Sequence, residues 1–174
     1  FPPVWDTAQA MYALGEAGVD RNDPRMLKAA DWILSKEVRQ KGDWAEKVRN
    51  VEPGGWYFEF NNEFYPDVDD TGQVLLALNC VDNPRERYQY EVCQRALDWI
   101  WAMQCRNGGW AAFDKDNTSR LPALIPFADF GEMIDPPSAD VTAHVVEMLG
   151  ILGVDRTHPA VDQAVRYLYA QQEP

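Results

Sequence analysis

Apolar residues recur along this chain at helical spacing, in segments that polar turns separate. One such segment repeats apolar residues three or four positions apart, which marks one face of a helix. Its members are Met26, Ala29, Ala30, Ile33 and Leu34. An unbroken apolar stretch runs over 74–78, and no alternating run of useful length indicates a strand. The pattern predicts an all-α fold.

The helical segments belong to an internal repeat. Shifting the chain by 135 positions aligns residues 7–36 with 142–171 without a gap. The matched pairs are Thr7 with Thr142, Leu14 with Leu149, Gly18 with Gly153 and Pro24 with Pro159. A middle copy contains Thr71, and its offset from the first copy drifts from 64 to 67. The drift predicts a longer internal connection in the middle copy.

Each unit contains two helical segments. The first is expected to begin at an Asp/Thr pair such as Asp6-Thr7, because a side-chain oxygen there caps free backbone N–H groups. The second is expected to begin at Asp23-Pro24 or His158-Pro159, because proline suits a first helical turn. Such hairpins bury their apolar faces only by stacking. We therefore expect stacked helical hairpins, with residues 1–174 forming about two and a half units excised from a longer chain.

The charge and the cysteine count narrow the function. Lys and Arg number 16 against 28 Asp and Glu, so the net charge of −12 argues against nucleic acid and against polybasic attachment to anionic lipid. No apolar run reaches the ~20 residues of a membrane-spanning helix, and no signal peptide is expected. Three cysteines without a CxxC pair indicate neither a disulfide framework nor a zinc site, and they are typical of a reducing compartment.

The candidate chemistry lies in the acidic run Asp67-Val68-Asp69-Asp70. Like charges this close cannot all ionise, so one carboxyl retains its proton. In the repeat, Asp69 and Asp140 occupy the position that Trp5 holds in the first unit, and His144 follows Asp140 by one helical turn. An imidazolium near the acids would raise their acidity, and Asp140 could hold that imidazole in orientation. The alternative is that these aspartates are helix caps.

A second pattern joins the units. The middle unit ends Arg95-Ala96-x-x-Trp99-Ile100-x-x-x-Gln104-x-x-x-Gly108-Gly109-Trp110, and the first ends with Glu37 and then Gly42-Asp43-Trp44. This resembles the QW repeat of triterpene cyclases. We expect the Gln side chain to hydrogen-bond the N-terminus of a neighbouring helix, with Trp packed over it.

The resemblance extends over the whole chain and is close to the squalene–hopene cyclase family. The segments that carry it are 3–7, 65–71 and 135–144. It implies a parent of two α/α barrels that cyclises squalene to pentacyclic hopene or hopanol through carbocations, with no metal and no organic cofactor. It also implies that Asp69 is the proton donor, supported by Asp67 and Asp70, with His144 as its partner and Asp140 alongside.

Aromatic residues complete the implied site. The resemblance places cation-stabilising aromatic residues at Trp5, Phe58, Tyr65 and Phe130. It places Phe127 at the constriction through which substrate enters, and Phe113 where some family members carry Tyr. Aromatic faces suit this chemistry because they stabilise a cation without quenching it, each by about 0.5–2 kcal/mol.

The resemblance further implies where the parent works. It would sit in one leaflet at the cytoplasmic side of the cell membrane without spanning it, and it would draw squalene or a related polyprenoid from the lipid interior. A homodimer of the parent is compatible with the resemblance.

Three other functions stay open from the sequence. An α/α-barrel glycosidase could use two carboxylates such as Asp69 and Asp140, although His144 would then have no clear task. A helical-repeat lipid carrier would need no acid, and a related class II cyclase would act on another polyprene. The products formed from squalene, and the effect of Asp69→Asn, separate these possibilities.

We predict that residues 1–174 alone are inactive, because the stacked units lack neighbours and part of the cavity lies outside them. Incubation of the isolated chain with squalene, followed by extraction of the products, checks this. Measurable cyclisation would contradict it.

Overall fold

The chain folds into three helical hairpins. The computed structural model describes residues 2–58, 62, 64–118 and 134–173, and within these ranges it contains six α-helices, one short 3-10 helix and no strand. The elements are α1 (Pro3–Glu16), α2 (Pro24–Leu34), η1 (Asp43–Glu46), α3 (Val68–Leu78), α4 (Glu86–Met103), α5 (Ala139–Ile151) and α6 (Pro159–Gln171). The predicted all-α fold is confirmed.

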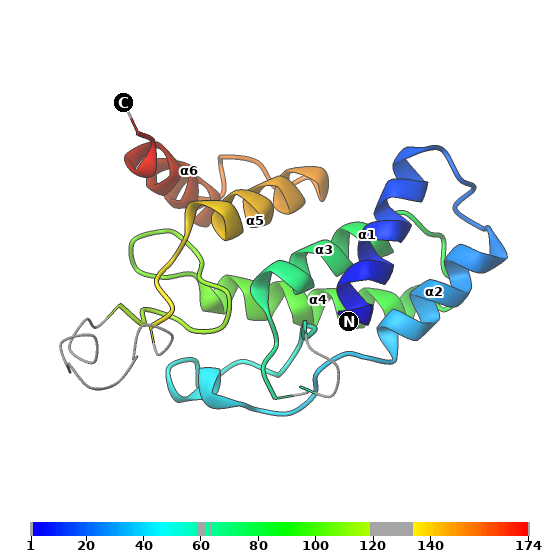
Figure 1. Cartoon of the computed structure of the whole chain (residues 1–174), viewed down its shortest axis with the longest axis horizontal. Helices are drawn as coiled ribbons and strands as arrows, with labels where there is room; N and C mark the ends of the chain where they lie inside the picture. The colour runs from blue at the N-terminus through cyan, green and yellow to red at the C-terminus, as the bar shows by residue number, and fades with distance from the viewer. Residues whose placement is uncertain (1, 59–61, 63, 119–133, 174) are drawn as a thin grey trace.

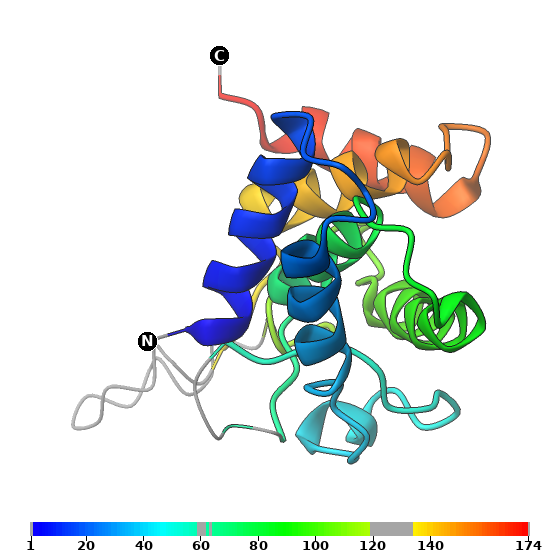
Figure 2. The same ribbon diagram turned by 90° about the vertical axis from the view of Figure 1, so that its right-hand side faces the viewer.

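The first helices of the three units form a row. Helix α3 lies in the middle of the molecule and packs against α1 on one side and α5 on the other (Figure 1). Each first helix also contacts the second helix of its own unit, and α1 and α2 lie side by side in the view turned by 90° (Figure 2). Stacking of hairpins therefore builds the fold, as the repeat predicts.

The connections inside the hairpins have equal length, which corrects one expectation. They cover 17–23, 79–85 and 152–158. The middle unit has no longer connection. Instead α4 has 18 residues whereas α2 has 11, so the extra residues extend a helix. The change of the repeat offset from 64 to 67 shows that the middle unit has extra residues, but it does not show whether they belong to a helix or to a connection.

The first helices begin earlier than the Asp/Thr pairs predict. Helix α1 begins at Pro3, without a side-chain cap, and Asp6 lies inside its first turn. Asp67 caps α3 and Ser138 caps α5. Proline and short polar side chains were available upstream of each Asp/Thr pair, and they begin the helix there.

The three equivalent threonines have a different task from capping. The hydroxyls of Thr7, Thr71 and Thr142 each donate a hydrogen bond to the backbone carbonyl four residues earlier. The acceptors are Pro3 at 2.7 Å, Asp67 at 2.6 Å and Ser138 at 2.6 Å. This shared geometry confirms the register of the repeat.

Two tryptophans tie successive units together through these threonines. The backbone N–H of Trp56 donates to Thr71 Oγ1 (3.0 Å), and that of Trp110 donates to Thr142 Oγ1 (2.9 Å). The indole N–H groups donate in turn to the carbonyls of the preceding second helices. The acceptors are Ile33 at 2.8 Å and Ile100 at 2.7 Å. Each tryptophan thus joins the helix before it to the helix after it.

The motif of the first unit is therefore Gly54-Gly55-Trp56, and the prediction of Gly42-Asp43-Trp44 is wrong. Trp44 is a core residue that packs edge-on against Trp99, with ring centroids 6.0 Å apart. In the first unit η1 is inserted between Glu37 and Gly54, and Trp56 still makes the same two hydrogen bonds as Trp110. The insertion puts Trp44 near the spacing from Glu37 that the motif predicts, although Trp56 fills the structural position.

The Gln of the motif reaches the next unit as predicted. Gln104 Nε2 donates to the carbonyl of Ala160 in the first turn of α6, at 2.9 Å. In the first unit Glu37 takes the place of Gln, and its carboxylate binds the Arg95 guanidinium of α4 through two contacts of 2.8 and 2.9 Å. Where the first unit has Glu37 in place of Gln, Arg95 on α4 supplies the positive charge that pairs with its carboxylate.

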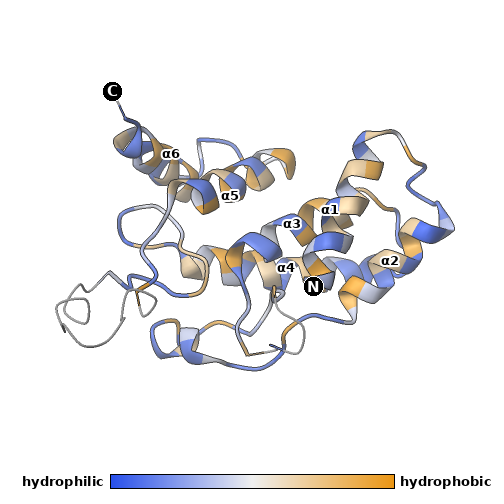
Figure 3. Ribbon diagram, in the orientation of Figure 1, coloured by the Kyte–Doolittle hydropathy of each residue, from blue (hydrophilic) through white to orange (hydrophobic). Residues whose placement is uncertain are grey.

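Apolar positions run along all six helices, whereas polar positions are frequent on the connections (Figure 3). The fully buried large side chains include Trp56, Trp99 and Trp110. In the part of the chain that the structure describes, no helix is both long and apolar enough to cross a bilayer.

We predict that Thr142→Val lowers the free energy of unfolding by about 1–3 kcal/mol, because it leaves the buried Trp110 N–H without an acceptor. The matched control is Thr7→Val. Within the described residues the Thr7 hydroxyl only donates, to Pro3, so its loss should cost less, about 0.5–1.5 kcal/mol. Urea unfolding of both variants measures the difference. Equal losses would show that the link to tryptophan adds no stability.

Candidate active site

The acidic run forms the N-terminus of α3. Asp67 is the cap, and its Oδ1 accepts hydrogen bonds from the backbone N–H groups of Asp69 (2.7 Å) and Asp70 (3.2 Å). Asp69 and Asp70 therefore occupy the first helical turn, where the exposed N–H groups and the helix dipole favour negative charge. The capping interpretation is correct for Asp67, and it leaves the other two carboxyls free for different contacts.

Asp69 meets His144 across two units. Its Oδ1 lies 2.7 Å from His144 Nδ1, so the contact joins α3 to α5. The His144 side chain is 55% exposed and that of Asp69 is 25% exposed. When the imidazole is protonated and the carboxyl is ionised, the contact is an ion pair. The structure thus brings together the acid and the histidine that the repeat singled out.

Asp140 lies on the same helix as His144 but interacts elsewhere. A hydrogen bond with Ser138, followed by one from the Val141 backbone, holds the pKa of the Asp140 carboxyl below its usual value. The nearby His144 is the smallest of the causes. Among the contacts of the described residues, no hydrogen bond joins Asp140 to the imidazole. The described contacts therefore do not show Asp140 holding the imidazole ring, and its role beside His144 stays a prediction.

The two buried aspartates hold protons to higher pH than usual. Burial, and then the charges of Asp67 and Asp69, raises the pKa of Asp70 to about 8. Burial also raises the pKa of Asp67 to about 6, against the two backbone hydrogen bonds that lower it. The Oδ1 atom of Asp70 is buried without a hydrogen-bond partner within the described chain. For both carboxyls, burial is a larger cause of the raised pKa than the crowding of like charges.

An aromatic pocket adjoins the acids. It has a volume of about 260 Å³ and is lined by Trp5, Phe58, Asp67, Asp69, Asp70 and Phe113. The rings of Trp5 and Phe58 meet edge-on, with centroids 6.5 Å apart. The pocket therefore places acid groups at the wall of a largely apolar hollow, which suits a hydrocarbon.

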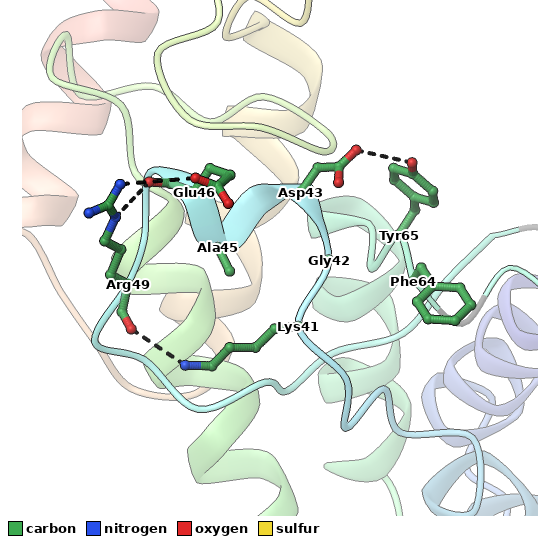
Figure 4. Close-up of a pocket in the computed structure, with 8 residues that line it drawn as sticks. All are labelled: Lys41, Gly42, Asp43, Ala45, Glu46, Arg49, Phe64 and Tyr65. Atoms are coloured by element: carbon green, nitrogen blue, oxygen red, sulfur yellow. Dashed lines mark hydrogen bonds and ion pairs between the residues drawn. The ribbon is translucent and has the colours of Figure 1, made fainter.

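Tyr65 lies in a different hollow. Its hydroxyl donates to Asp43 Oδ2 at 3.1 Å, and both residues line a larger, more polar pocket of about 860 Å³ (Figure 4). The other lining residues are Lys41, Gly42, Ala45, Glu46, Arg49 and Phe64. Tyr65 is not among the residues that line the acid pocket, and Asp43 binds its hydroxyl, so a role for Tyr65 near the cavity stays a prediction. Phe127 and Phe130 lie outside the described residues.

One residue near the site received no role from the sequence. Asp135 accepts hydrogen bonds from the backbone N–H groups of Phe113 (2.6 Å) and Asp114 (2.7 Å). Asp135 belongs to the segment 135–144 that carries the family resemblance, so the sequence could have marked it as a candidate. Sequence spacing did not show that it binds the loop at Phe113 and Asp114.

Comparison with known proteins gives a consistent result. The family model described as "Squalene-hopene cyclase C-terminal domain" matches residues 1–174. The squalene–hopene cyclase of Alicyclobacillus acidocaldarius is 49% identical over 172 residues, covering 99% of this chain and 27% of that protein. The squalene-hopene cyclase of Schizosaccharomyces japonicus is 41% identical over 98% of this chain and 27% of its own length.

A relative with a different product name is also similar. The dammaradiene synthase of Dryopteris crassirhizoma is 39% identical over 98% of this chain and 26% of its own length. The chain thus spans about a quarter of the length of these relatives. The resemblance read from the repeat and the acidic run is confirmed.

We predict that Asp70→Asn becomes increasingly stabilising as pH rises. In the unfolded chain Asp70 ionises near pH 4, whereas in the folded chain its pKa is about 8. The stability that this group contributes is complete below about pH 4 and is lost as pH rises to 8. Asparagine stays neutral, so its free-energy advantage should grow by at least about 1 kcal/mol between pH 5 and 9.

Urea unfolding at a series of pH values measures this trend. The control is Asp155→Asn, since hydrogen bonds from Thr157 lower the pKa of Asp155 and its ionisation is complete above pH 5. Its difference from the parent protein should stay flat from pH 5 to 9. A flat profile for Asp70→Asn as well would contradict a raised pKa for Asp70.

Proposed function

This chain belongs to the squalene-hopene cyclase C-terminal domain family, and on that premise we propose that it carries the acid of a cyclase that converts squalene to hopene or hopanol. The contact of 2.7 Å between Asp69 and His144, beside an aromatic pocket, is the observation that carries this proposal. Protonation of an alkene needs a strong acid next to an apolar surface, and this arrangement places Asp69 at such a surface.

Asp69 is the proton donor in the proposed reaction. Its O–H bond breaks as a C–H bond forms at a terminal double bond of the polyprene, and a carbocation forms on the adjacent carbon. Successive double bonds then attack the cation and close the rings. Loss of a proton ends the sequence as an alkene, and addition of water followed by loss of a proton ends it as an alcohol. The hydrogen bond from His144 Nδ1 stabilises the Asp69 carboxylate that remains.

The two buried aspartates have different roles. Asp67 fixes the first turn of α3 through its capping bonds, and so it sets where Asp69 points. The raised pKa of Asp70, about 8, keeps that carboxyl neutral at neutral pH. A neutral carboxyl does not remove a proton from a nearby carbocation as a carboxylate would. We assign Asp140 a supporting role through its charge near His144.

The aromatic residues that line the pocket stabilise the carbocation in the proposed reaction. Trp5, Phe58 and Phe113 line the pocket with the acids, and each ring face stabilises positive charge by about 0.5–2 kcal/mol. Phe113 lacks the hydroxyl that Tyr would add at this position. Phe130 as a further cation-stabilising ring, Tyr65 near the cavity and Phe127 at the substrate entrance remain predictions for the whole enzyme.

We extend the proposal to the whole protein. Residues 1–174 would form an incomplete α/α-barrel domain of about two and a half repeat units within a longer chain of two barrels. The relatives, of which this chain spans about a quarter, support that arrangement. The enzyme would take squalene or a related polyprenoid from the lipid interface at the cytoplasmic side of the membrane, as a monotopic protein, and it could form a homodimer.

We predict that Asp69→Asn lowers turnover of squalene by at least about 100-fold in the full-length protein, because the amide has no proton to donate. His144→Ala should lower it by at least about tenfold while folding is retained, since the carboxylate loses its hydrogen-bond partner. Gas chromatography with mass spectrometry of extracted products measures both rates.

The exposed Asp155→Asn variant is the control and should keep the parent rate. Full turnover by Asp69→Asn would overturn the assignment of the acid. Activity on an oligosaccharide alone would favour the glycosidase alternative, and unchanged lipid binding without any turnover would favour a carrier.

A further inference from the structure

Asp135 binds one loop with both its side chain and its backbone. Its Oδ2 accepts from the N–H groups of Phe113 (2.6 Å) and Asp114 (2.7 Å), and its own N–H donates to the Asn117 carbonyl at 3.1 Å. These three hydrogen bonds fix the segment 113–117, which begins three residues after Trp110, the residue that joins the second unit to the third. A single carboxylate oxygen therefore organises the start of this loop.

The same loop touches the acid helix. The carbonyl of Ala112 accepts a hydrogen bond from the N–H of Val68, the first residue of α3, at 2.8 Å. The first N–H groups of a helix have no partner inside the helix, so this bond attaches the N-terminus of α3 to the loop. A second bond, from the Asp67 N–H to the Trp56 carbonyl at 2.7 Å, holds the residue before it. Asp69 follows Val68 directly, so the position of the donor depends in part on where the loop lies.

The loop also carries a wall of the acid pocket. Phe113, whose backbone N–H is bound by Asp135, lines the pocket together with Asp69 and Asp70. Phe113 is 43% exposed, so packing holds its ring only in part. The backbone bond to Asp135 fixes the main chain from which the ring projects into the pocket.

Other groups hold the outer part of the loop. Lys47 Nζ lies 3.0 Å from Asp114 Oδ2, and Lys115 Nζ donates to the Ala102 carbonyl at 2.8 Å. These two contacts involve the side chains of Asp114 and Lys115, which follow Phe113 in the chain. Within the described residues, the hydrogen bond from the Phe113 N–H to Asp135 is the one that holds the backbone of Phe113.

We propose that Asp135 is a positioning residue of the cyclisation, one that sets the distance between the Phe113 ring and the Asp69 acid through the 112–114 loop. This inference rests on the proposed function. A displaced ring would leave an early carbocation poorly stabilised, and such a cation loses a proton before all rings have closed. Asp135 would therefore govern how far the cyclisation proceeds as well as how fast it starts.

The test compares two variants in the full-length protein. Asp135→Ala removes the acceptor, whereas Asp135→Asn keeps an oxygen that can accept the same two N–H groups, removes the charge and replaces the second oxygen with an NH2 group. We expect Asp135→Ala to lower kcat about 10- to 100-fold, the range for small misplacement of a reacting group, and to raise the share of incompletely cyclised products several-fold. Asp135→Asn should restore most of the rate and the parent product ratio.

The matched control is Asp155→Ala. Asp155 likewise accepts a backbone N–H, that of Thr157 at 2.8 Å, but in the 152–158 connection rather than at the pocket. It should keep the parent rate and product ratio. All assays are run well below the measured Tm of each variant, so that the product ratio reports the folded enzyme.

The possible outcomes separate the two proposals. No cyclisation by the parent protein, or full activity of Asp69→Asn, would remove the proposed function. An active parent with an inactive Asp69→Asn, but a parent-like product ratio for Asp135→Ala, would overturn this inference alone. Equal impairment of Asp135→Ala and Asp135→Asn would also overturn it, since charge rather than positioning would then be the cause.

Discussion

The hydrogen bond between a tryptophan backbone and a threonine hydroxyl fixes the relation between neighbouring units. Thr142 Oγ1 accepts from the N–H of Trp110 and donates to the Ser138 carbonyl, and Thr71 does the same with Trp56 and Asp67. These bonds are buried, so shifting a unit by one residue would leave polar groups without partners. The constraint holds the first helices of the units in one fixed register.

The candidate site depends on that register. Asp69 lies two residues before Thr71, and His144 lies two residues after Thr142. Because α3 packs against α5, these offsets bring the two side chains to 2.7 Å although they are 75 residues apart in sequence. The repeat thus provides equivalent first helices, α3 and α5, and the candidate catalytic side chains lie on these two helices. The equivalent helix of the first unit carries Trp5, which lines the pocket instead.

The three aspartates of the run divide the work of one site because their surroundings differ. Asp67 is held by the helix N-terminus, Asp70 is buried without a partner for its Oδ1, and Asp69 reaches the neighbouring unit. Burial raises the pKa of Asp67 and Asp70, whereas the hydrogen bond with Ser138 lowers that of Asp140. Asp67 and Asp70 are three residues apart in sequence, yet their pKa values are raised to about 6 and about 8.

The sequence by itself determined the helical hairpins and their register, because apolar spacing and the repeat are local or periodic signals. The repeat also singled out Asp69 and His144, which the structure brings into contact. The sequence pointed to Trp44 where the structure uses Trp56, and it put extra residues of the middle unit into a connection rather than into α4. Insertions change spacing, whereas the buried hydrogen bonds that define the motif survive them. Tertiary structure alone decided that Tyr65 turns to Asp43 and that Asp135 holds the loop beneath Phe113. Both depend on contacts between segments whose approach no periodic pattern encodes.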